Sequence, residues 1–346
     1  MLILFNMNTK VIIDPNANIL YASFHIKGLT DRFGNKNIYF NSAPFVSVKN
    51  RTGFNFSFIL ERDGIITKYF MHLDDPYKID EDAYEWCDVY GHVNANFEKT
   101  PTQYWPKIVS LAPMFSIRPW NLFGTIYSAF SNYLKVREQV NIRKFFGKYK
   151  RLYKIRRPLN ENFPSPIHSN FRPYVFHMST LWYDNEWNNN DEGVNKTRAN
   201  FIIACKSIES IEFEGGLVME KNRKINPLFE PLIFRTKISI QTYLNNIKKS
   251  VLVFNTPAFW DCHGWKLGEY LAMGKAIIST PLSNDLPEPL VHGQNIHIVE
   301  NNIEEFKKAI IMISNDNEYR KKLEKGAREY WEKYGDPQKS LDLMGI

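Results

Sequence analysis

Five residues with complementary chemistry lie within nine positions: Asp261, His263, Gly264, Lys266 and Glu269. Free N–H groups at a helix start form an anion site suited to a diphosphate, and Gly264 lets the backbone approach it. Lys266 adds a positive charge, and Glu269, one turn further, can accept hydrogen bonds from two vicinal hydroxyls. The two carboxylates flank this anion site. Such a site suits a nucleotide sugar, because that ligand has a diphosphate in the middle and hydroxyl groups at both ends. The alternative is that Asp261 and Lys266 are solvated loop residues and Glu269 caps the helix.

A strand–helix–strand unit must position these side chains. The continuous apolar run 251–254 predicts a buried parallel strand, 264–273 predicts a short helix, and 276–278 predicts the next strand. Gly274 stands where a helix C-cap is expected. Ligands of open α/β sheets bind beyond the carboxyl ends of the strands, which is where the five residues fall.

Residues 251–334 resemble the C-terminal domain of GT-B glycosyltransferases, most closely the family with an E-x7-E motif. Here the motif reads Asp261-x7-Glu269, followed by YLAMGKAIIST. Leu286-Pro287-Glu288 and Gly293 fall at that family's "IPE…G" loop, and the family's two closing helices follow. The first acid is Asp, which shortens its reach to the sugar and leaves retention and inversion both open.

The resemblance implies an α/β protein with two Rossmann-like domains facing each other across a cleft. It implies transfer of a sugar from a nucleotide-sugar donor to a glycan or lipid-linked acceptor, in cell-surface polysaccharide synthesis. The site residues that we predict are donor-binding Arg198, Gly264, Trp265, Lys266 and Glu269, and catalytic Asp261, His263, Asp74 and Asp75. We expect no cofactor and no metal ion, because the helix start and basic side chains neutralise the leaving diphosphate.

Two further function classes remain open at this stage. One is a nucleotide-sugar epimerase of the same fold, and the other is a basic nucleic-acid-binding protein. The role of Arg198 is also open. It stands at the start of a predicted helix at 197–208, where it can either clamp a diphosphate or pair with a surface acid.

The first half of the chain predicts a second α/β domain. Residues 11–14 indicate a strand, 17–32 a helix, and 55–71 a hairpin around the turn Asp63-Gly64. Asp74 and Asp75 follow the second hairpin strand directly, so either is a candidate base for the acceptor hydroxyl if the enzyme inverts. The alternative is a polar turn before a helix at 80–87.

Residues 135–157 carry ten basic residues and one acid, a net charge of +9 in a chain of +7. Phe145, Phe146, Tyr149 and Tyr153 form an aromatic stripe at roughly helical spacing. Such a segment can lie on an anionic membrane surface or bind nucleic acid, or it is a solvated basic helix. We predict the membrane surface as a partner and no nucleic acid.

The length of 346 residues suits two domains. We expect an acceptor-binding domain at 1–157, a linker at 158–173, a donor-binding domain at 174–320 and a terminal helix at 321–346 that crosses back. Three scattered cysteines, the absence of a signal-peptide pattern and the lack of an apolar run of about 20 residues predict a cytoplasmic protein, with or without peripheral attachment to the inner face of the membrane.

Overall fold

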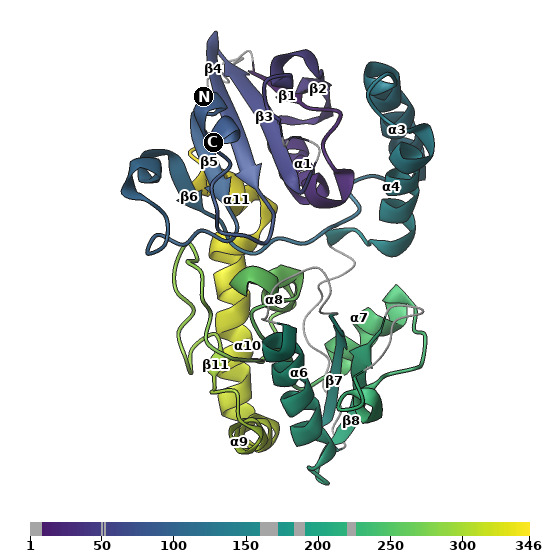
Figure 1. Ribbon diagram of the computed structural model, residues 1–346, viewed down its shortest axis with the longest axis vertical. Coiled ribbons are helices and arrows are strands. Elements are labelled where there is room, and N and C mark those ends of the chain that lie inside the picture. The colour runs from purple at the N-terminus through teal and green to yellow at the C-terminus, as the bar shows by residue number, and fades with distance from the viewer. Residues whose placement is uncertain (1–8, 50, 52, 160–171, 183–190, 220–225) are drawn as a thin grey trace, which may run out of the picture. The chain divides into compact units, whose positions relative to one another are not determined.

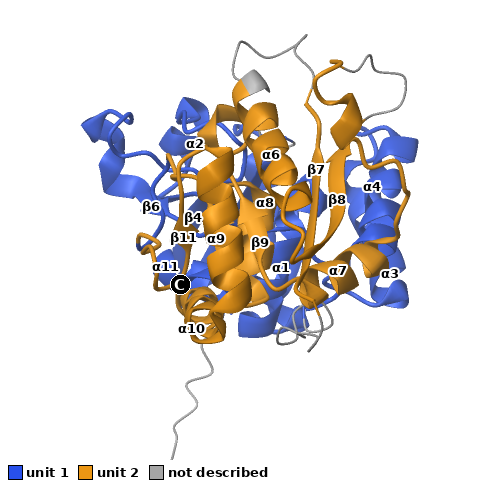
Figure 2. Cartoon of the chain, turned by 90° about the horizontal axis from the view of Figure 1, so that it is seen from below, with its two compact units in different colours: residues 1–161, 284–288, 334–346 blue, residues 162–283, 289–333 orange. Residues whose placement is uncertain are grey.

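The computed structural model describes the whole chain except residues 1–8, 50, 52, 160–171, 183–190 and 220–225 (Figure 1). Most of the predicted linker 158–173 therefore lies outside the described residues. The chain divides into two compact units (Figure 2). Unit 1 comprises 1–161, 284–288 and 334–346, and unit 2 comprises 162–283 and 289–333. This division differs from the predicted bounds in two places, because 284–288 belong to unit 1 and 321–333 belong to unit 2. That the two units face each other across a cleft stays a prediction.

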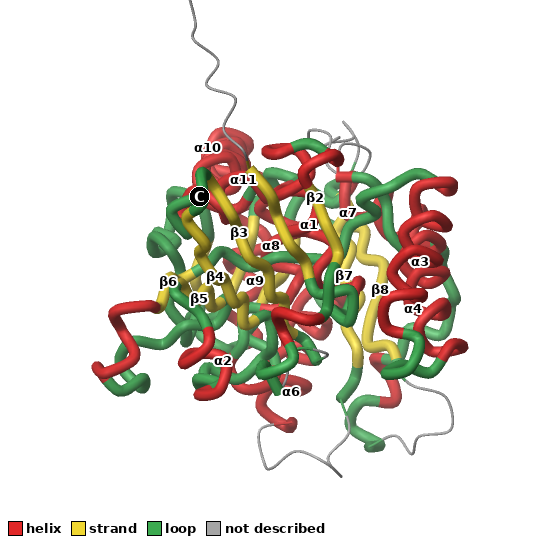
Figure 3. Tube along the Cα trace, turned by 90° about the horizontal axis from the view of Figure 1, so that it is seen from above, coloured by secondary structure: helices red, strands yellow, loops and turns green. Residues whose placement is uncertain are grey.

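Unit 1 is built on a mixed sheet whose strands are visible in Figure 3. The strand order is β2 (Ile38–Phe40), β1 (Thr9–Ile13), β3 (Asn55–Arg62), β4 (Ile65–His72), β5 (Val89–His92), β6 (Ile108–Ser110). Only the pairings of β3 are antiparallel. The predicted hairpin is confirmed, and its turn residues Asp63 and Gly64 have φ of 52° and 83°, as a tight two-residue hairpin turn requires.

The helices of unit 1 are α1 (Ile19–Phe33), α2 (Glu81–Trp86), α3 (Leu122–Val136), α4 (Ile142–Ile155) and α11 (Pro337–Leu343). The predicted helices at 17–32 and 80–87 correspond to α1 and α2, whereas the sequence analysis did not predict α3. The end of the chain returns to α1, where Gln338 donates to the carbonyl of Gly28 at 2.7 Å. Gly28 permits this approach, because a Cβ there would lie 2.8 Å from the Pro337 carbonyl oxygen.

Unit 2 contains two groups of parallel strands. β7 (Tyr174–Thr180) pairs with β8 (Glu212–Val218), and β9 (Val253–Asn255), β10 (Ile277–Ser279) and β11 (His297–Ile298) pair in the order β11-β10-β9. The N–H of Val251 donates to the Tyr174 carbonyl at 2.8 Å, so β9 runs beside β7. Gly215 of β8 has φ of 130°, and a Cβ there would lie 1.9 Å from the His177 carbonyl oxygen, so only glycine fits.

The helices of unit 2 are α6 (Asp191–Lys206), α7 (Ile240–Lys249), α8 (Gly264–Ala272), α9 (Ile303–Asn315) and α10 (Asn317–Tyr330). The core joins α6 and α9 to the strands, with the Phe201 and Phe254 rings stacked at 4.2 Å and Phe306 against their edges. The predicted C-cap of α8 is confirmed. Gly274 has φ of 59°, its N–H donates to Leu271 and that of Lys275 donates to Tyr270, which is a Schellman motif.

Candidate active site

Two cationic side chains from different helices meet the carboxyl end of β7. Arg198 of α6 donates to the carbonyl of Thr180, the last residue of β7, at 2.7 Å. The Lys266 ammonium of α8 donates to the carbonyl of Met178 and, at 3.2 Å, to the Ser179 hydroxyl. Both contacts hold the cationic groups at the carboxyl edge of the strands, where ligands of α/β sheets bind. The structure thus brings together two of the predicted donor-binding residues.

The two cations sit in a poorly solvated environment that already carries positive charge. Burial and the neighbouring Arg198 charge lower the pKa of Lys266 to about 7, while the carboxylate of Glu269 acts in the opposite direction. Burial lowers the pKa of Arg198 to about 10. Charges that are costly to bury favour an anionic ligand, because the anion would restore their ordinary pKa values.

The backbone in front of α8 is unusually shaped. Trp260, Asp261 and Gly264 have φ of 54°, 60° and 67°, in the left-handed region that a bulky residue such as Trp rarely adopts. The loop closes through a hydrogen bond from the N–H of Ala258 to the carbonyl of Cys262 at 2.9 Å. This turn places Asp261 immediately before the helix start, which is the position that the sequence analysis assigned to it.

The remaining predicted donor-side residues differ in exposure. Asp261, Trp265 and Glu269 are half-buried, while His263 is buried at the N-cap position of α8. The negative charge of Glu269 acts on both Lys266 and Tyr270. Glu269 follows Lys266 by three residues on α8, so the two side chains project from the same side of the helix.

The sequence analysis missed a row of small polar side chains at the carboxyl ends of β9 and β10. Asn255 donates to the Ser279 hydroxyl at 3.0 Å, and the hydroxyls of Thr256 and Thr280 lie 2.9 Å apart. Three of them, Asn255, Ser279 and Thr280, are buried. The sequence carried this signal, because Asn255 and Thr256 directly follow one predicted strand and Ser279 and Thr280 directly follow the next. They lie at the carboxyl ends of β9 and β10, the two strands that α8 connects.

In unit 1, Asp74 lines an open pocket of about 880 Å³ at the carboxyl end of β4, together with Asn55 and His72. Burial raises the pKa of the Asp74 carboxyl above its ordinary value, although the N–H of Asp75 donates to it at 2.9 Å. Asp75 is exposed and does not line this pocket. The two predicted candidate bases therefore differ in their exposure and in their surroundings.

Asp14 is a further acid at the same edge that the sequence analysis did not single out. Asp14 directly follows β1, as Asp74 closely follows β4, so the same pattern would have found it. Its side chain is 1% exposed, accepts from the N–H of Asn16 at 3.0 Å and lies 3.7 Å from Arg51. Burial raises the pKa of Asp14 to about 6. Its burial makes it less suited than Asp74 to meet a substrate.

The basic segment does not form one helix with an outward aromatic stripe. Lys135 lies in the last turn of α3, which ends at Val136, and α4 begins only at Ile142. Phe145 and Tyr149 of the stripe are buried, and the Asn132 amide donates to the Tyr149 hydroxyl at 3.0 Å. An aromatic stripe that lies on a membrane surface is therefore wrong for these two rings, because they pack α4 against its neighbours.

Five basic residues of α4 are exposed: Arg143, Lys144, Lys150, Arg151 and Lys154. Burial and the charges of Asp75 and Asp74 raise the pKa of Tyr21, while the charges of Arg156, at the C-cap of α4, and Arg151 act in the opposite direction. The C-terminal end of α4 thus brings positive charge close to Tyr21.

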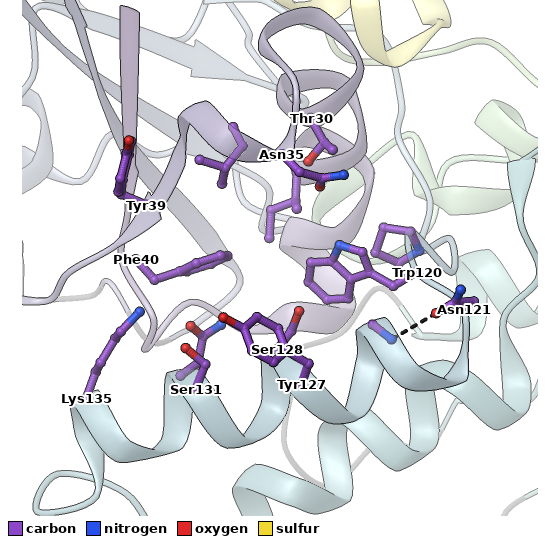
Figure 4. A pocket seen from close by; sticks show the side chains of 15 residues that line it. Thr30, Asn35, Tyr39, Phe40, Trp120, Asn121, Tyr127, Ser128, Ser131 and Lys135 are labelled. Carbon is purple, nitrogen blue, oxygen red and sulfur yellow. Dashed lines mark hydrogen bonds between the residues drawn. The ribbon is translucent and has the colours of Figure 1, made fainter.

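A second cavity of unit 1, of about 610 Å³, is bounded by α1, β2 and α3 (Figure 4). Thr30, Tyr39, Phe40 and Trp120 line it, and Ser128, Ser131 and Lys135 of α3 point into it. None of the predicted site residues lies in this cavity.

Comparison with known families gives a match within unit 2. Residues 231–330 match the family described as "Glycosyl transferases group 1". Residues 231–330 are thus similar to a group 1 glycosyltransferase domain. The matched segment contains Asp261, Lys266 and Glu269, whereas Arg198 and Asp74 lie outside it. No curated protein matches the chain significantly.

Solved structures similar to the chain include proteins described as glycosyltransferases. One is the C-terminal domain of a glycosyl transferase group 1 family protein, LpcC from Francisella tularensis, at 13% identity over 50% of this chain and 88% of that one, with a TM-score of 0.32. A glycosyltransferase from Rickettsia africae has 16% identity over 78% and 66%, with a TM-score of 0.40. The MnaA–UDP complex of S. aureus has 13% identity over 75% and 59%, with a TM-score of 0.39. The chain thus spans less than two thirds of the latter two, and TM-scores of this size do not establish a shared fold, so the family match alone carries the domain assignment.

The described part of the chain contains no group of three or more His, Cys, Asp or Glu residues able to hold a metal ion. In the same residues, no helix is both long and apolar enough to cross a membrane.

Proposed function

We propose that the chain transfers a sugar from a nucleotide-sugar donor, bound by unit 2, to a glycan or lipid-linked acceptor, bound by unit 1. The bond between the anomeric carbon and the donor phosphate breaks, the acceptor oxygen bonds to that carbon, and a nucleoside diphosphate leaves. The observation that supports this most is the pair Arg198 and Lys266 beside the start of α8, within the unit that contains the group 1 match.

The donor roles follow from charge and position. Lys266, Arg198 and the N–H groups after Gly264 would neutralise the leaving diphosphate, because positive groups held at a poorly solvated edge stabilise developing charge without reorganising. Glu269 would accept hydrogen bonds from the ribose hydroxyls. Asp261 and His263 would serve the sugar or its leaving oxygen, with Trp265 beside them.

The acceptor side depends on the stereochemistry. If the enzyme inverts, Asp74 would take the proton of the acceptor hydroxyl, since it lines a pocket and its pKa is raised by burial. If the enzyme retains configuration, no separate base is needed and Asp74 would position the acceptor. We propose that the transferred sugar is a hexose and that no metal ion is needed. The cationic side chains would neutralise the leaving diphosphate in place of a divalent cation.

We further propose that residues 135–157 attract an anionic membrane surface that presents the acceptor. The exposed Arg143, Lys144, Lys150 and Lys154 support this, because each basic residue near an anionic surface contributes about 1 kcal/mol. The protein would then work at the cytoplasmic face of the membrane in polysaccharide synthesis.

Mass spectrometry of the products tests the proposal. The protein is incubated with a set of nucleotide sugars and a lipid extract. Transfer predicts release of a nucleoside diphosphate together with an acceptor heavier by one sugar residue. An epimerase of the same fold would instead give a product of unchanged mass, separable by chromatography, without any acceptor, and that result would overturn the proposal.

A further inference from the structure

Helix α3 presents large apolar side chains to solvent. Phe123, Ile126, Phe130 and Leu134 follow one another at steps of three or four residues and therefore lie on one side of the helix, which we term the apolar face of α3. They are 81%, 46%, 58% and 64% exposed. Lys135 is the only charged residue of α3. Isolated exposed apolar residues are ordinary, but a continuous row along a helix indicates an interaction surface.

The other sides of α3 already have their own partners. Thr125, Ala129, Asn132 and Val136 are buried and hold the helix in unit 1. Ser128 and Ser131 point toward the second cavity (Figure 4). Because successive residues turn by about 100° around the axis, the apolar face is directed away from both. The side chains of this face therefore remain at least 46% exposed, and the Phe130 ring meets α4 at its border.

Positive charge borders this face. The helices α3 and α4 lie side by side at one flank of unit 1 (Figures 1 and 3). The Phe130 ring lies 5.0 Å from the Phe146 ring of α4. Arg143 and Lys150 stand three residues before and four after Phe146, so they flank it on the same side of α4, and both are exposed. An apolar strip with a basic border is the pattern of a helix that lies in a membrane interface.

We propose that the apolar face of α3 inserts into the interface of an anionic lipid bilayer, while Arg143 and Lys150 contact the lipid headgroups. The inference rests on the proposed membrane association and assigns its apolar component to α3 in place of the buried aromatic rings of α4. A second copy of the chain is a poorer occupant, because it would bring two segments of +9 together. Lipid supplies both the apolar surface and the opposite charge.

Vesicle sedimentation of the full chain tests this proposal. The parent, Phe123→Gln with Phe130→Gln, and a matched control, Ile65→Gln with Leu228→Gln, are mixed with phosphatidylglycerol–phosphatidylcholine vesicles. The control residues are 71% and 78% exposed and lie outside α3. Salt is raised from about 0.1 M to about 1 M, which shortens the screening length from about 10 Å to about 3 Å. Parent and control should keep measurable binding at high salt. The α3 variant should bind at least about tenfold more weakly than the parent at both salt concentrations.

A probe attached at position 123 gives a direct readout. Cys87, Cys205 and Cys262 are buried, so a Phe123→Cys variant should label selectively with an environment-sensitive dye. Its emission should shift to shorter wavelength on addition of vesicles, and a dye at Leu228→Cys should not respond. Equal binding by parent and α3 variant, no shift at position 123, or a parent dimer in sedimentation velocity that the α3 variant abolishes would overturn the proposal. The thermal shift caused by nucleoside diphosphates reports on unit 2 separately, so failure of lipid insertion is distinguishable from failure of donor binding.

Discussion

Replacement of Lys266 by Met should weaken binding of a nucleoside diphosphate strongly. The Lys266 ammonium is held at the carboxyl end of β7, beside Arg198, where screening by water is small. A charged hydrogen bond in such a place contributes about 1.5 to 3 kcal/mol, so the dissociation constant should rise by about tenfold to 150-fold. Isothermal titration with UDP, ADP, GDP and CDP measures this.

The protein offers a matched control in Lys275. Lys275 is buried, its pKa is likewise lowered by burial to about 7, and its ammonium donates to the carbonyls of Lys248 and Ser250 at the end of α7. Lys275→Met removes the same kind of buried cation from the other end of the strand–helix–strand unit. It should lower the melting temperature without changing the dissociation constant of the nucleotide.

The affinity should also depend on pH. Lys266 with a pKa of about 7 is mostly charged at pH 6 and mostly neutral at pH 8. Only the charged form attracts a diphosphate, so binding should weaken as the pH rises above 7, by up to about tenfold per unit. In Lys266→Met this component should be missing. The reasoning is refuted if Lys266→Met binds as the parent does at pH 6, or if Lys275→Met loses affinity equally.

Three other predictions concern the remaining groups. Glu269→Gln should keep the fold and weaken nucleotide-sugar binding, because the charged hydrogen bonds to the ribose are lost; an unchanged dissociation constant would remove the ribose assignment. Glycosyl transfer should survive EDTA, and a strict requirement for magnesium or manganese would contradict the cationic account. If the enzyme inverts, Asp74→Asn should lower kcat by about 10²-fold or more without changing donor affinity, whereas Asp75→Asn should have little effect.

The sequence predicted those structural features that depend on residues close together in the chain. The hairpin follows from Asp63-Gly64 between two apolar runs, and the α8 unit follows from a buried strand, a capping glycine and a second strand. The site side chains at strand ends were predicted by the same logic. Asp14 shows its limit, since the same pattern was present there and its burial against Arg51 depends on residues far away in the chain.

The orientation of α4 could not be predicted in this way. A stripe of Phe145, Phe146, Tyr149 and Tyr153 shows which side of the helix is apolar, but not whether protein or lipid covers it. In the structure, α3 covers Phe145 and Tyr149, and Asn132 of α3 donates a hydrogen bond to the Tyr149 hydroxyl. The exposed row of α3 likewise depends on which side of the helix packs against the rest of unit 1, and that is decided by tertiary packing.

A thermal-shift screen of nucleotide sugars tests the central claim most directly, since it asks whether unit 2 binds a donor. A ligand at 100 times its dissociation constant stabilises the folded state by about 2.7 kcal/mol, which should raise the melting temperature of a unit of this size by about 5 to 10 °C. We expect such a shift with at least one nucleotide sugar and a much smaller one in Lys266→Met at the same concentration. The absence of a shift with every nucleotide sugar, or an equal shift in parent and variant, would contradict the account.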